Sequence, residues 1–439
     1  MKSKLSIYFF LLLLIGLWSC KSEDTVFEQT ADERINASLD GYQKQLTDAQ
    51  FGWKAVIYPG AGGVYSFYFK FNAQNRVVMY SDFDKESAVT PKESSYRLKA
   101  LQNPSLIFDT YSYLHVLADP DGSVNGGQYG EGLKSDFEFS FKADSLNTGS
   151  VTLIGTKNRS RLVLTKATQE ESVAYGSGGL GKSLLFSNIA NYLTYFKRIT
   201  LGSVTYEIGV NQDARTITLN WLVGTTVNSF TTEYYYTSLG VAFLTPFTNG
   251  AQSLNGFTDF TWDATKMSLG LTAGGVKTTV MEAAKPLKID LTAPKRWYDI
   301  PVATGGYWFS PDGFHVNGVD DAFKVNDLKS GTASYYYYFY WPAFNTTYDA
   351  FGPAFLSGNS LSLIYADAPK TPTFTADGRV TFSTLGTLGA YPTDGTAAAA
   401  ISSRNQLFDV NGYYLVQLTE STYDMVSAKD GKTWISWQR

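Results

Sequence analysis

The chain has 439 residues and a formal net charge of −4; 44% of its residues are hydrophobic and 17% are charged. This length predicts several domains with hydrophobic cores, and the composition argues against a largely disordered chain, which would combine low hydrophobicity with high net charge. The slightly acidic net charge gives no reason to expect nucleic-acid binding. The single cysteine excludes an internal disulfide or a thiolate metal cluster, and the presence of only two histidines disfavours a site that needs several imidazoles.

Residues 1–19 are typical of a bacterial lipoprotein signal peptide. A short basic start precedes an apolar run, Ile7 to Leu17, that is too short to span a bilayer comfortably. The run ends in Leu17-Trp18-Ser19-Cys20, which resembles a lipobox although Trp18 replaces the usual small residue. The resemblance implies cleavage before Cys20 and diacylglycerol on its sulfur; the alternative is a signal peptide without lipidation.

A lipidated tether, residues 20–29, is predicted to follow. Its acidic start, Ser22-Glu23-Asp24, looks like the surface-export signal of lipoproteins from Bacteroidota. Acyl chains anchor a protein because each buried methylene contributes about 0.8 kcal/mol. We therefore expect a lipid-anchored protein of the outer membrane, and the acidic start favours the cell surface over the periplasmic face.

The first predicted module, residues 30–168, is a helix followed by an antiparallel β-meander. Thr30 and Glu33 form a capping-box pattern, and helical spacing predicts a helix over 32–50. The period then changes to two, which predicts a hairpin of 65–71 and 76–80. Further strands are predicted at 94–98, 106–110, 136–141, 151–155 and 161–165.

The second predicted module, residues 169–290, repeats this order in degenerate form. A second helical face runs from Leu184 to Phe196, before a hairpin of 204–210 and 215–223. Three segments align between the modules: 71–79 with 210–218, 105–110 with 240–245, and 136–139 with 259–262. These observations indicate a two-fold repeat, unless the likeness is one that any two β-meanders share.

The third predicted module, residues 291–439, follows a proline-rich boundary at 285–301. Its sequence shows no convincing long helix, and strands are predicted at 335–340, 361–365, 379–382, 413–418 and 434–437. We interpret it as a β-sandwich or barrel-like module that is rich in aromatic residues. The predicted fold class is therefore mainly β, a β-rich α+β chain.

The segment Gly176-Ser177-Gly178-Gly179-Leu180-Gly181-Lys182-Ser183 fits the P-loop pattern letter for letter. A P-loop must hang from a buried strand, whereas the residues before this segment include Gln169, Glu170 and Glu171. We therefore interpret the segment as a flexible linker between the two repeats.

A second segment, Asp119 to Gly126, alternates oxygen-bearing side chains in a way that calcium favours. It lacks the bidentate glutamate of an EF-type loop, and Asp-Pro-Asp-Gly is also a common turn. His115 and His315 are lone histidines without metal-ligand spacing, and carboxylate pairs are assembled by the fold and not by chain spacing. We assign no catalytic residue, no metal ligand and no cofactor.

The most unusual feature is the aromatic run from Tyr335 to Phe344. In a strand, Tyr336, Tyr338 and Tyr340 would share one face. Together with Trp341 they are the candidate ligand-binding residues, because a row of rings can stack on sugars or grip a peptide. The alternative is that these are ordinary aromatic residues of a β-sheet core.

Several segments form a recognisable set: Leu46 with Gly52-Trp53, the strands at 65–71 and 77–79, Asp136-Phe137-Glu138-Phe139 and 153–157. This set resembles a Bacteroidota lipoprotein family known as domain of unknown function 4302. It implies an accessory surface lipoprotein, associated with TonB-dependent (SusC/SusD-like) uptake pairs. Its motifs are structural, so it implies no active-site residue.

We therefore expect a surface-anchored, non-catalytic lipoprotein that binds a glycan or peptide for a TonB-dependent nutrient uptake system. Its expected partners are the membrane, through the lipid, such a ligand and the transporter complex, with no nucleic acid. A hydrolase using a carboxylate pair, or a structural subunit of an envelope complex, remains an alternative.

Overall fold

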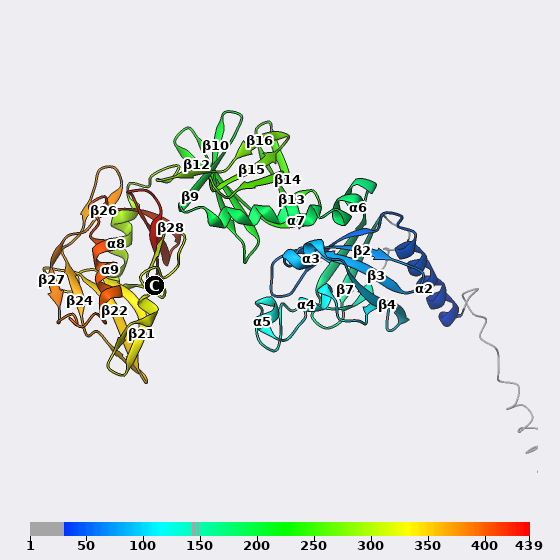
Figure 1. The fold of residues 1–439 in the computed structure, drawn as a ribbon, viewed down its shortest axis with the longest axis horizontal. Helices are drawn as coiled ribbons and strands as arrows, with labels where there is room; N and C mark the ends of the chain where they lie inside the picture. Colours follow the sequence, from blue (N-terminus) through cyan, green and yellow to red (C-terminus); the bar gives the residue numbers. More distant parts are fainter. Residues whose placement is uncertain (1–29, 143–145, 147–148) are drawn as a thin grey trace, which may run out of the picture. The chain divides into compact units, whose positions relative to one another are not determined.

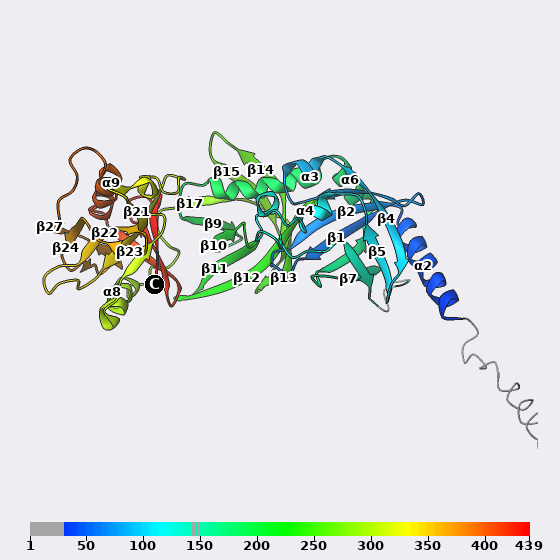
Figure 2. The ribbon, with the colours of Figure 1, turned by 90° about the horizontal axis from the view of Figure 1, so that it is seen from below.

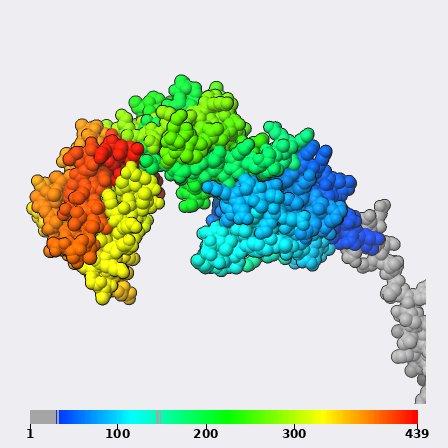
Figure 3. Space-filling model, viewed as in Figure 1, coloured from blue at the N-terminus to red at the C-terminus, as the bar shows by residue number. Residues whose placement is uncertain are grey.

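A computed structural model describes residues 30–142, 146 and 149–439; the predicted signal peptide, Cys20 and the tether lie outside them. The described chain is mainly β, with three antiparallel sheets and a few short helices (Figure 1). It divides into two compact units. Among the described residues, the first comprises those up to Ala61, Phe67–Met79 and those of Lys92–Thr168, and the second Gly62–Ser66, Tyr80–Pro91 and Gln169–Arg439. Figure 3 colours the same chain in space-filling form, with the third sheet running from yellow to red.

The first helix, α2 (Ala31–Thr47), begins at the predicted capping box. The Thr30 hydroxyl accepts a hydrogen bond from the Glu33 N–H at 3.2 Å, and the Glu33 carboxylate accepts one from the Thr30 N–H at 2.8 Å. The helix ends three residues before the predicted Gln50. Its buried Leu46 carbonyl accepts a hydrogen bond from the Trp53 indole at 2.9 Å, which fixes the helix against the start of the sheet. Figure 2 shows the ribbon of α2 beside this sheet.

The first sheet is a closed eight-stranded barrel in the order β1 to β8. The predicted hairpin is confirmed as β2 and β3, and closure comes from β8 pairing with β1 between Trp53↔Lys166 and Tyr58↔Arg161. Alternating side chains fill the interior, as in β1, where every second residue is buried. The elements are β1 (Trp53–Tyr58), β2 (Tyr65–Phe71), β3 (Arg76–Ser81), β4 (Lys92–Ala100), β5 (Pro104–Phe108), α4 (Tyr113–Val116), α5 (Gly122–Asn125), β6 (Glu138–Phe141), β7 (Ser150–Gly155) and β8 (Arg161–Lys166).

The second sheet has nine strands and curls into a near-closed barrel. Its last long hairpin returns toward β9, where the Thr278 hydroxyl donates a hydrogen bond to the Thr200 carbonyl at 3.1 Å. The strands are β9 (Phe196–Leu201), β10 (Val204–Asn211), β11 (Thr216–Val223), β12 (Thr226–Thr237), β13 (Gly240–Asn249), β14 (Gln252–Asp263), β15 (Ser268–Ala273), β16 (Val276–Thr279) and β17 (Met281–Ala283).

Four short helices of the second unit accompany this sheet: α3 (Lys85–Val89), α6 (Gln169–Gly176), α7 (Gly179–Ser183) and the 3-10 helix η2 (Leu184–Asn191). The predicted second helical face is thus shorter than expected, because Phe196 already lies in β9. The apolar side of η2 still packs inward: the Phe186 ring lies 5.6 Å from that of Tyr234 and 5.3 Å from that of Phe260.

The third sheet has thirteen strands around one large aromatic core. The expected strands at 335–340, 379–382, 413–418 and 434–437 are present, but only the first residues of 361–365 form a strand. The strands are β18 (Trp308–Ser310), β19 (Phe314–Val316), β20 (Lys329–Ser330), β21 (Ala333–Trp341), β22 (Ala350–Ser357), β23 (Ser360–Ser362), β24 (Ala366–Pro369), β25 (Thr373–Phe374), β26 (Arg379–Thr381), β27 (Thr384–Leu388), β28 (Tyr413–Thr419), β29 (Thr422–Ser427) and β30 (Thr433–Gln438).

No long helix is expected after residue 291, but the structure has two helices there that were not predicted, α8 (Ala293–Thr304) and α9 (Ala398–Leu407), besides the short 3-10 helix η3 (Val325–Asp327). Pro294 lies in the first turn of α8, where a missing N–H costs little. Trp297 of α8 is fully buried, and its carbonyl accepts a hydrogen bond from the Trp308 indole at 2.8 Å. Packing against the sheet therefore stabilises this helix, although the prolines of its sequence had indicated a boundary between two modules.

Candidate functional site

The aromatic run lies in β21, a strand flanked by β18 and β22 in the third sheet. A register shift against β22 lies between Tyr335 and Tyr337, so the strict alternation expected for the run is interrupted. Tyr338 and Tyr340 are fully buried in the core, whereas Tyr336 is 54% exposed. The prediction that these three tyrosines share one face is therefore wrong, because the bulge separates Tyr336 from the other two.

The two buried tyrosines have structural partners. The Tyr340 hydroxyl donates to the Asp349 carboxylate at 2.6 Å, and its ring lies 4.8 Å from that of Trp297. The Tyr338 hydroxyl donates to the Ala400 carbonyl in α9 at 3.4 Å. Burial raises the pKa of both phenols well above the usual value. Neither side chain is accessible to a ligand.

The opposite face of β21 carries a continuous set of rings that reaches solvent. We call it the outer aromatic strip: Tyr307, Phe309, Tyr336, Tyr337, Trp341, Phe344 and Tyr348. Neighbouring ring centroids lie 5.1 Å apart for Tyr336 and Tyr337, 5.3 Å for Tyr307 and Trp341, and 5.2 Å for Trp341 and Phe344. Two of the four predicted ligand-binding residues, Tyr336 and Trp341, thus belong to it.

The strip is anchored at its centre and open at its ends. Tyr337 is buried and shares a 2.7 Å hydrogen bond with the Tyr307 hydroxyl, while Phe344 is 40% exposed. Tyr307, Trp341 and Tyr348 are half-buried, so each keeps part of its ring in contact with solvent. This arrangement offers rigid apolar surfaces with hydroxyl groups at their edges, which suits flat ligands with apolar faces and polar rims.

Tyr307 and Phe309 were not predicted from the sequence. The sequence does contain a signal for them, because the side chains of Tyr307-Trp308-Phe309 point alternately to the two faces of the sheet, as those of a strand do. Trp308 is the one that faces the core. Phe344 and Tyr348 come from the turn after β21, and no periodicity marks a turn residue as part of a sheet face.

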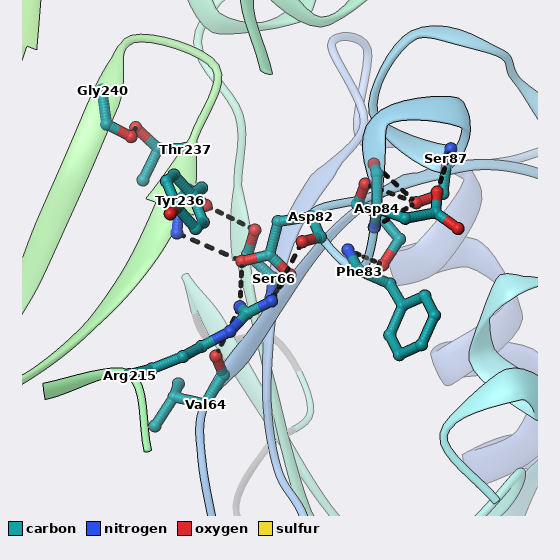
Figure 4. Close-up of polar contacts among 11 residues, drawn as sticks. Val64, Ser66, Asp82, Phe83, Asp84, Ser87, Arg215, Tyr236, Thr237 and Gly240 are labelled. Carbon is teal, nitrogen blue, oxygen red and sulfur yellow. Dashed lines mark hydrogen bonds and ion pairs between the residues drawn. The ribbon is translucent and has the colours of Figure 1, made fainter. Parts of the chain in front are cut away.

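A buried ion pair of Arg215 and Asp82 lies in the interior of the second unit (Figure 4). The Arg215 guanidinium lies 2.6 Å from an Asp82 carboxylate oxygen, and both side chains are almost inaccessible. Asp82 also accepts hydrogen bonds from the backbone N–H groups of Ser66 at 2.9 Å and Tyr236 at 3.1 Å. Burial raises the pKa of Asp82, and Arg215 and the two N–H donors act against that rise.

Arg215 uses its remaining donors locally. It donates to the carbonyls of Val64 at 2.8 Å and Asp82 at 3.0 Å, and its guanidinium lies 4.0 Å from the Tyr65 ring. Because each carboxylate oxygen has a donor and the cation is enclosed, the cluster leaves no group for a ligand. We interpret it as structural, and sequence reasoning missed it because 133 residues separate the pair.

The P-loop-like segment is not a phosphate loop, and it is not a flexible linker either. It ends α6 and forms α7. A Cβ on Gly181 would lie 2.5 Å from a Val89 methyl group of α3, and one on Gly179 would lie 2.4 Å from the Ser238 carbonyl oxygen. The glycines therefore allow α7 to approach its neighbours closely.

The oxygen-rich segment forms a turn and the short helix α5. Asp119 accepts hydrogen bonds from the Asp121 N–H at 3.0 Å and the Tyr111 hydroxyl at 2.6 Å, and Asp121 accepts from the Ser123 N–H at 2.9 Å. These carboxylates are thus already used in the turn. Within residues 30–142, 146 and 149–439, no group of three or more His, Cys, Asp or Glu side chains is placed to hold a metal ion.

His115 is buried in the first unit. Its ring stacks on Phe137, with centroids 4.7 Å apart, and its Nε2 lies 3.2 Å from the Phe108 carbonyl oxygen. Burial lowers its pKa. It therefore serves packing, as expected for a lone histidine in a core.

Among the helices that the structure describes, none has the length and apolar character needed to cross a membrane.

Two solved structures to which the chain is similar show only a very weak likeness. Transferrin binding protein B from Neisseria meningitidis is 8% identical, with 88% of this chain and 75% of that chain covered and a TM-score of 0.15. The Helicobacter pylori beta clamp bound to a DNA ligase peptide is 8% identical, with 93% and 97% covered and a TM-score of 0.13.

No curated protein matches the chain. The family described as "Domain of unknown function (DUF4302)" matches residues 23–264, which is more than half of the chain and includes the first sheet and most of the second. The chain therefore belongs to the DUF4302 family.

Proposed function

We propose that this protein is a lipid-anchored protein of the outer-membrane surface that binds a glycan, without catalysis, for a TonB-dependent (SusC/SusD-like) uptake system. The observation that carries the binding part is the outer aromatic strip, where Tyr336 and Phe344 are exposed beside half-buried Trp341. Rigid rings can stack on the apolar faces of sugars, and their loss of conformational entropy on binding is small because they are already packed.

The topology favours a glycan over an extended peptide. Peptides commonly bind by adding a strand to a free sheet edge, and β21 has no free edge because β18 and β22 pair with it on both sides. The residues of the strip also carry no charge. A ligand must therefore be held by its faces and hydroxyl groups, which suits a neutral sugar chain.

A glycan array tests the binding proposal. The protein would carry Cys20→Ser, so that no lipid is attached, and would be compared with the same protein carrying Trp341→Ala or Tyr336→Ala. We expect Trp341→Ala to weaken binding at least about fivefold, because truncating an aromatic residue that anchors a ligand costs more than about 1 kcal/mol. The matched control is Tyr129→Ala, which removes a tyrosine that is 72% exposed elsewhere in the chain. Binding to no glycan, or equal effects of the strip and control variants, would contradict the proposal.

The anchor is tested separately in a Bacteroidota host. Mass spectrometry of the mature protein is expected to find an acylated Cys20 at the amino terminus, and protease added to intact cells is expected to degrade the protein. An unmodified amino terminus would refute the anchor, and protection from protease would refute the surface location. Neither result bears on the aromatic strip.

A further inference from the structure

A cleft of about 640 Å³ lies among α3, α7, η2 and β14, all of which belong to the second unit. Lys85 and Val89 lie four residues apart in α3 and therefore share one face of that helix. Lys182 lies three residues before Leu185, so one face continues from α7 into η2. Trp262 of β14 completes the walls. The volume falls within the range of small-ligand pockets, about 300–1,000 Å³.

The walls of this cleft are apolar and are held in place by their own packing. A Cβ on Gly181 would lie 2.5 Å from a Val89 methyl group, so α7 lies directly against α3. The Trp262 indole meets the Tyr192 ring edge-on with centroids 6.0 Å apart, and backbone hydrogen bonds of 2.8 Å and 2.7 Å fix the Tyr192 hydroxyl. Val89 is 52% exposed, and Leu185 and Trp262 are half-buried. Rigid apolar surface is thus left open to a ligand.

The polar side chains that η2 contributes to the cleft are already engaged. The Ser187 hydroxyl donates a hydrogen bond to the Leu184 carbonyl at 2.7 Å. The Asn188 amide group donates one to the Leu185 carbonyl at 3.0 Å, and its oxygen accepts one from the Asn191 side chain at 2.9 Å. These groups therefore offer little to a polar ligand.

The two lysines of the cleft are not engaged in this way. Lys85 and Lys182 are both exposed, and neither has a hydrogen-bond or ion-pair partner in residues 30–142, 146 and 149–439. The described lining contains no aspartate or glutamate. Nearby, Asp84 caps α3 by accepting the Ser87 N–H at 2.7 Å (Figure 4), and Glu86 follows Lys85 in the helix, where adjacent side chains do not face each other. The cleft thus combines apolar walls with two uncompensated positive charges on its solvent side.

We propose that this cleft binds a medium-chain fatty carboxylate, with its alkyl chain on the apolar walls and its head group between Lys85 and Lys182. Binding would remove apolar surface of both partners from water, and the two ammonium groups favour an anion. Three of the four elements around the cleft are helical, and a helix bonds its own backbone groups, so an extended peptide would find few backbone partners. A ligand with one charged end and an apolar chain needs none.

Calorimetric titration of the full chain carrying Cys20→Ser tests the proposal. The probes are octanoate, octan-1-ol, which lacks the charge, acetate, which lacks the chain, and octylammonium, which reverses the charge. We expect saturable binding of octanoate, about tenfold tighter than that of any other probe and weaker as salt is raised. No saturable binding of octanoate, or equal binding of octan-1-ol, acetate or octylammonium, would overturn the proposal.

Variants locate the binding in this cleft. Lys85→Met and Lys182→Met remove the charges but keep apolar side chains, so each should weaken octanoate binding about threefold and both together about tenfold. The control is Lys277→Met, at an exposed lysine of β16 outside the cleft. Val89→Asp puts a carboxylate on the wall and should weaken octanoate binding more than Val173→Asp, at a 63% exposed valine of α6. Losses no larger than those of the two controls would overturn the proposal.

Two other occupants are outcomes of the same experiments. A dimer in sedimentation analysis that Val89→Asp dissociates would assign the cleft to a second copy of the chain and overturn the proposal. A synthetic helix with leucines on one face and glutamates on the other, if it bound more tightly than octanoate, would instead assign the cleft to an acidic partner protein. None of the substituted residues belongs to the outer aromatic strip, so the glycan array should be unchanged in every variant.

Discussion

Asp82 and Asp367 are both buried aspartates of the second unit, but their surroundings differ. Asp82 has a guanidinium at 2.6 Å and donors on both oxygens. Asp367, in β24, accepts one hydrogen bond from the Tyr391 hydroxyl at 2.8 Å, and its Oδ1 has none among the described residues, with Arg404 Nε 4.0 Å away. Burial raises the pKa of Asp367 to about 6, with Tyr391 and Arg404 acting against the rise. The carboxylate of Asp82, with donors on both oxygens, is therefore a structural charge. The carboxylate of Asp367, with one hydrogen bond, is a group that titrates near neutral pH.

The strongest test of this difference is Arg215→Met, which leaves Asp82 buried without its cation. We expect a loss of about 3–5 kcal/mol in the free energy of unfolding, measured by urea denaturation. The matched control is Arg76→Met, which removes an exposed ion pair with Glu93 and should cost less than about 1 kcal/mol. Similar losses in both variants would show that the enclosed pair contributes no more than a surface pair.

Asp367 should make stability depend on pH. Its pKa in the folded protein lies above the ordinary 3.8, so the folded state favours the protonated form. The stabilisation is complete below about pH 4 and is lost as the pH rises through about 6, by about 3 kcal/mol in total.

In urea titrations between pH 4 and 7, Asp367→Asn should lack this decline. The exposed control Asp377→Asn should retain it. A wild-type decline that survives in Asp367→Asn would assign the effect to another group.

Tyr340→Phe sharpens the comparison within the third sheet, where Asp349 is fully bonded. Asp349 accepts from the hydroxyls of Tyr340 at 2.6 Å and Tyr298 at 3.0 Å, and from the Ala343 N–H at 2.7 Å. Removing one donor from this carboxylate should cost about 2 kcal/mol in thermal or urea unfolding. Tyr336→Phe is the control on the same strand, and no change in Tyr340→Phe would mean that the hydroxyl bond contributes nothing net.

The smallest effect is expected from Tyr336→Ala, on the exposed side of β21. Because this ring is 54% exposed, its loss should change the free energy of unfolding by no more than about 0.5 kcal/mol. A much larger loss would show that the strip is part of the core, and a glycan-binding defect in this variant would then have a structural cause.

Local patterns in the sequence predicted much of the fold. The capping box at Thr30, the hairpin of β2 and β3 and the antiparallel, mainly β character are confirmed. Closure of the first sheet was beyond such reasoning, because it depends on β1 pairing with β8 about a hundred residues later. Helix α8 was missed because tertiary packing of Trp297 outweighs the unfavourable prolines.

For the candidate sites, too, local patterns predicted one part and long-range contacts decided the rest. The aromatic run marked the correct strand, but the bulge decided which rings reach solvent. The ion pair of Asp82 and Arg215 joins residues that are far apart in the chain, and no spacing in the sequence indicates it. The aligned repeat even placed Arg215 opposite Arg76, although one is enclosed and the other exposed.

The aromatic run of β21 has a consequence for the register in which this strand pairs with its neighbours. Both parities of Tyr335-Tyr336-Tyr337-Tyr338-Phe339-Tyr340-Trp341 are aromatic, so sliding the strand by one residue would still offer rings to both faces. Hydrophobicity alone therefore does not distinguish the correct pairing from its neighbour. The register is instead determined by single hydrogen bonds, such as the one from the Tyr340 hydroxyl to Asp349, which only one pairing of the strands can form.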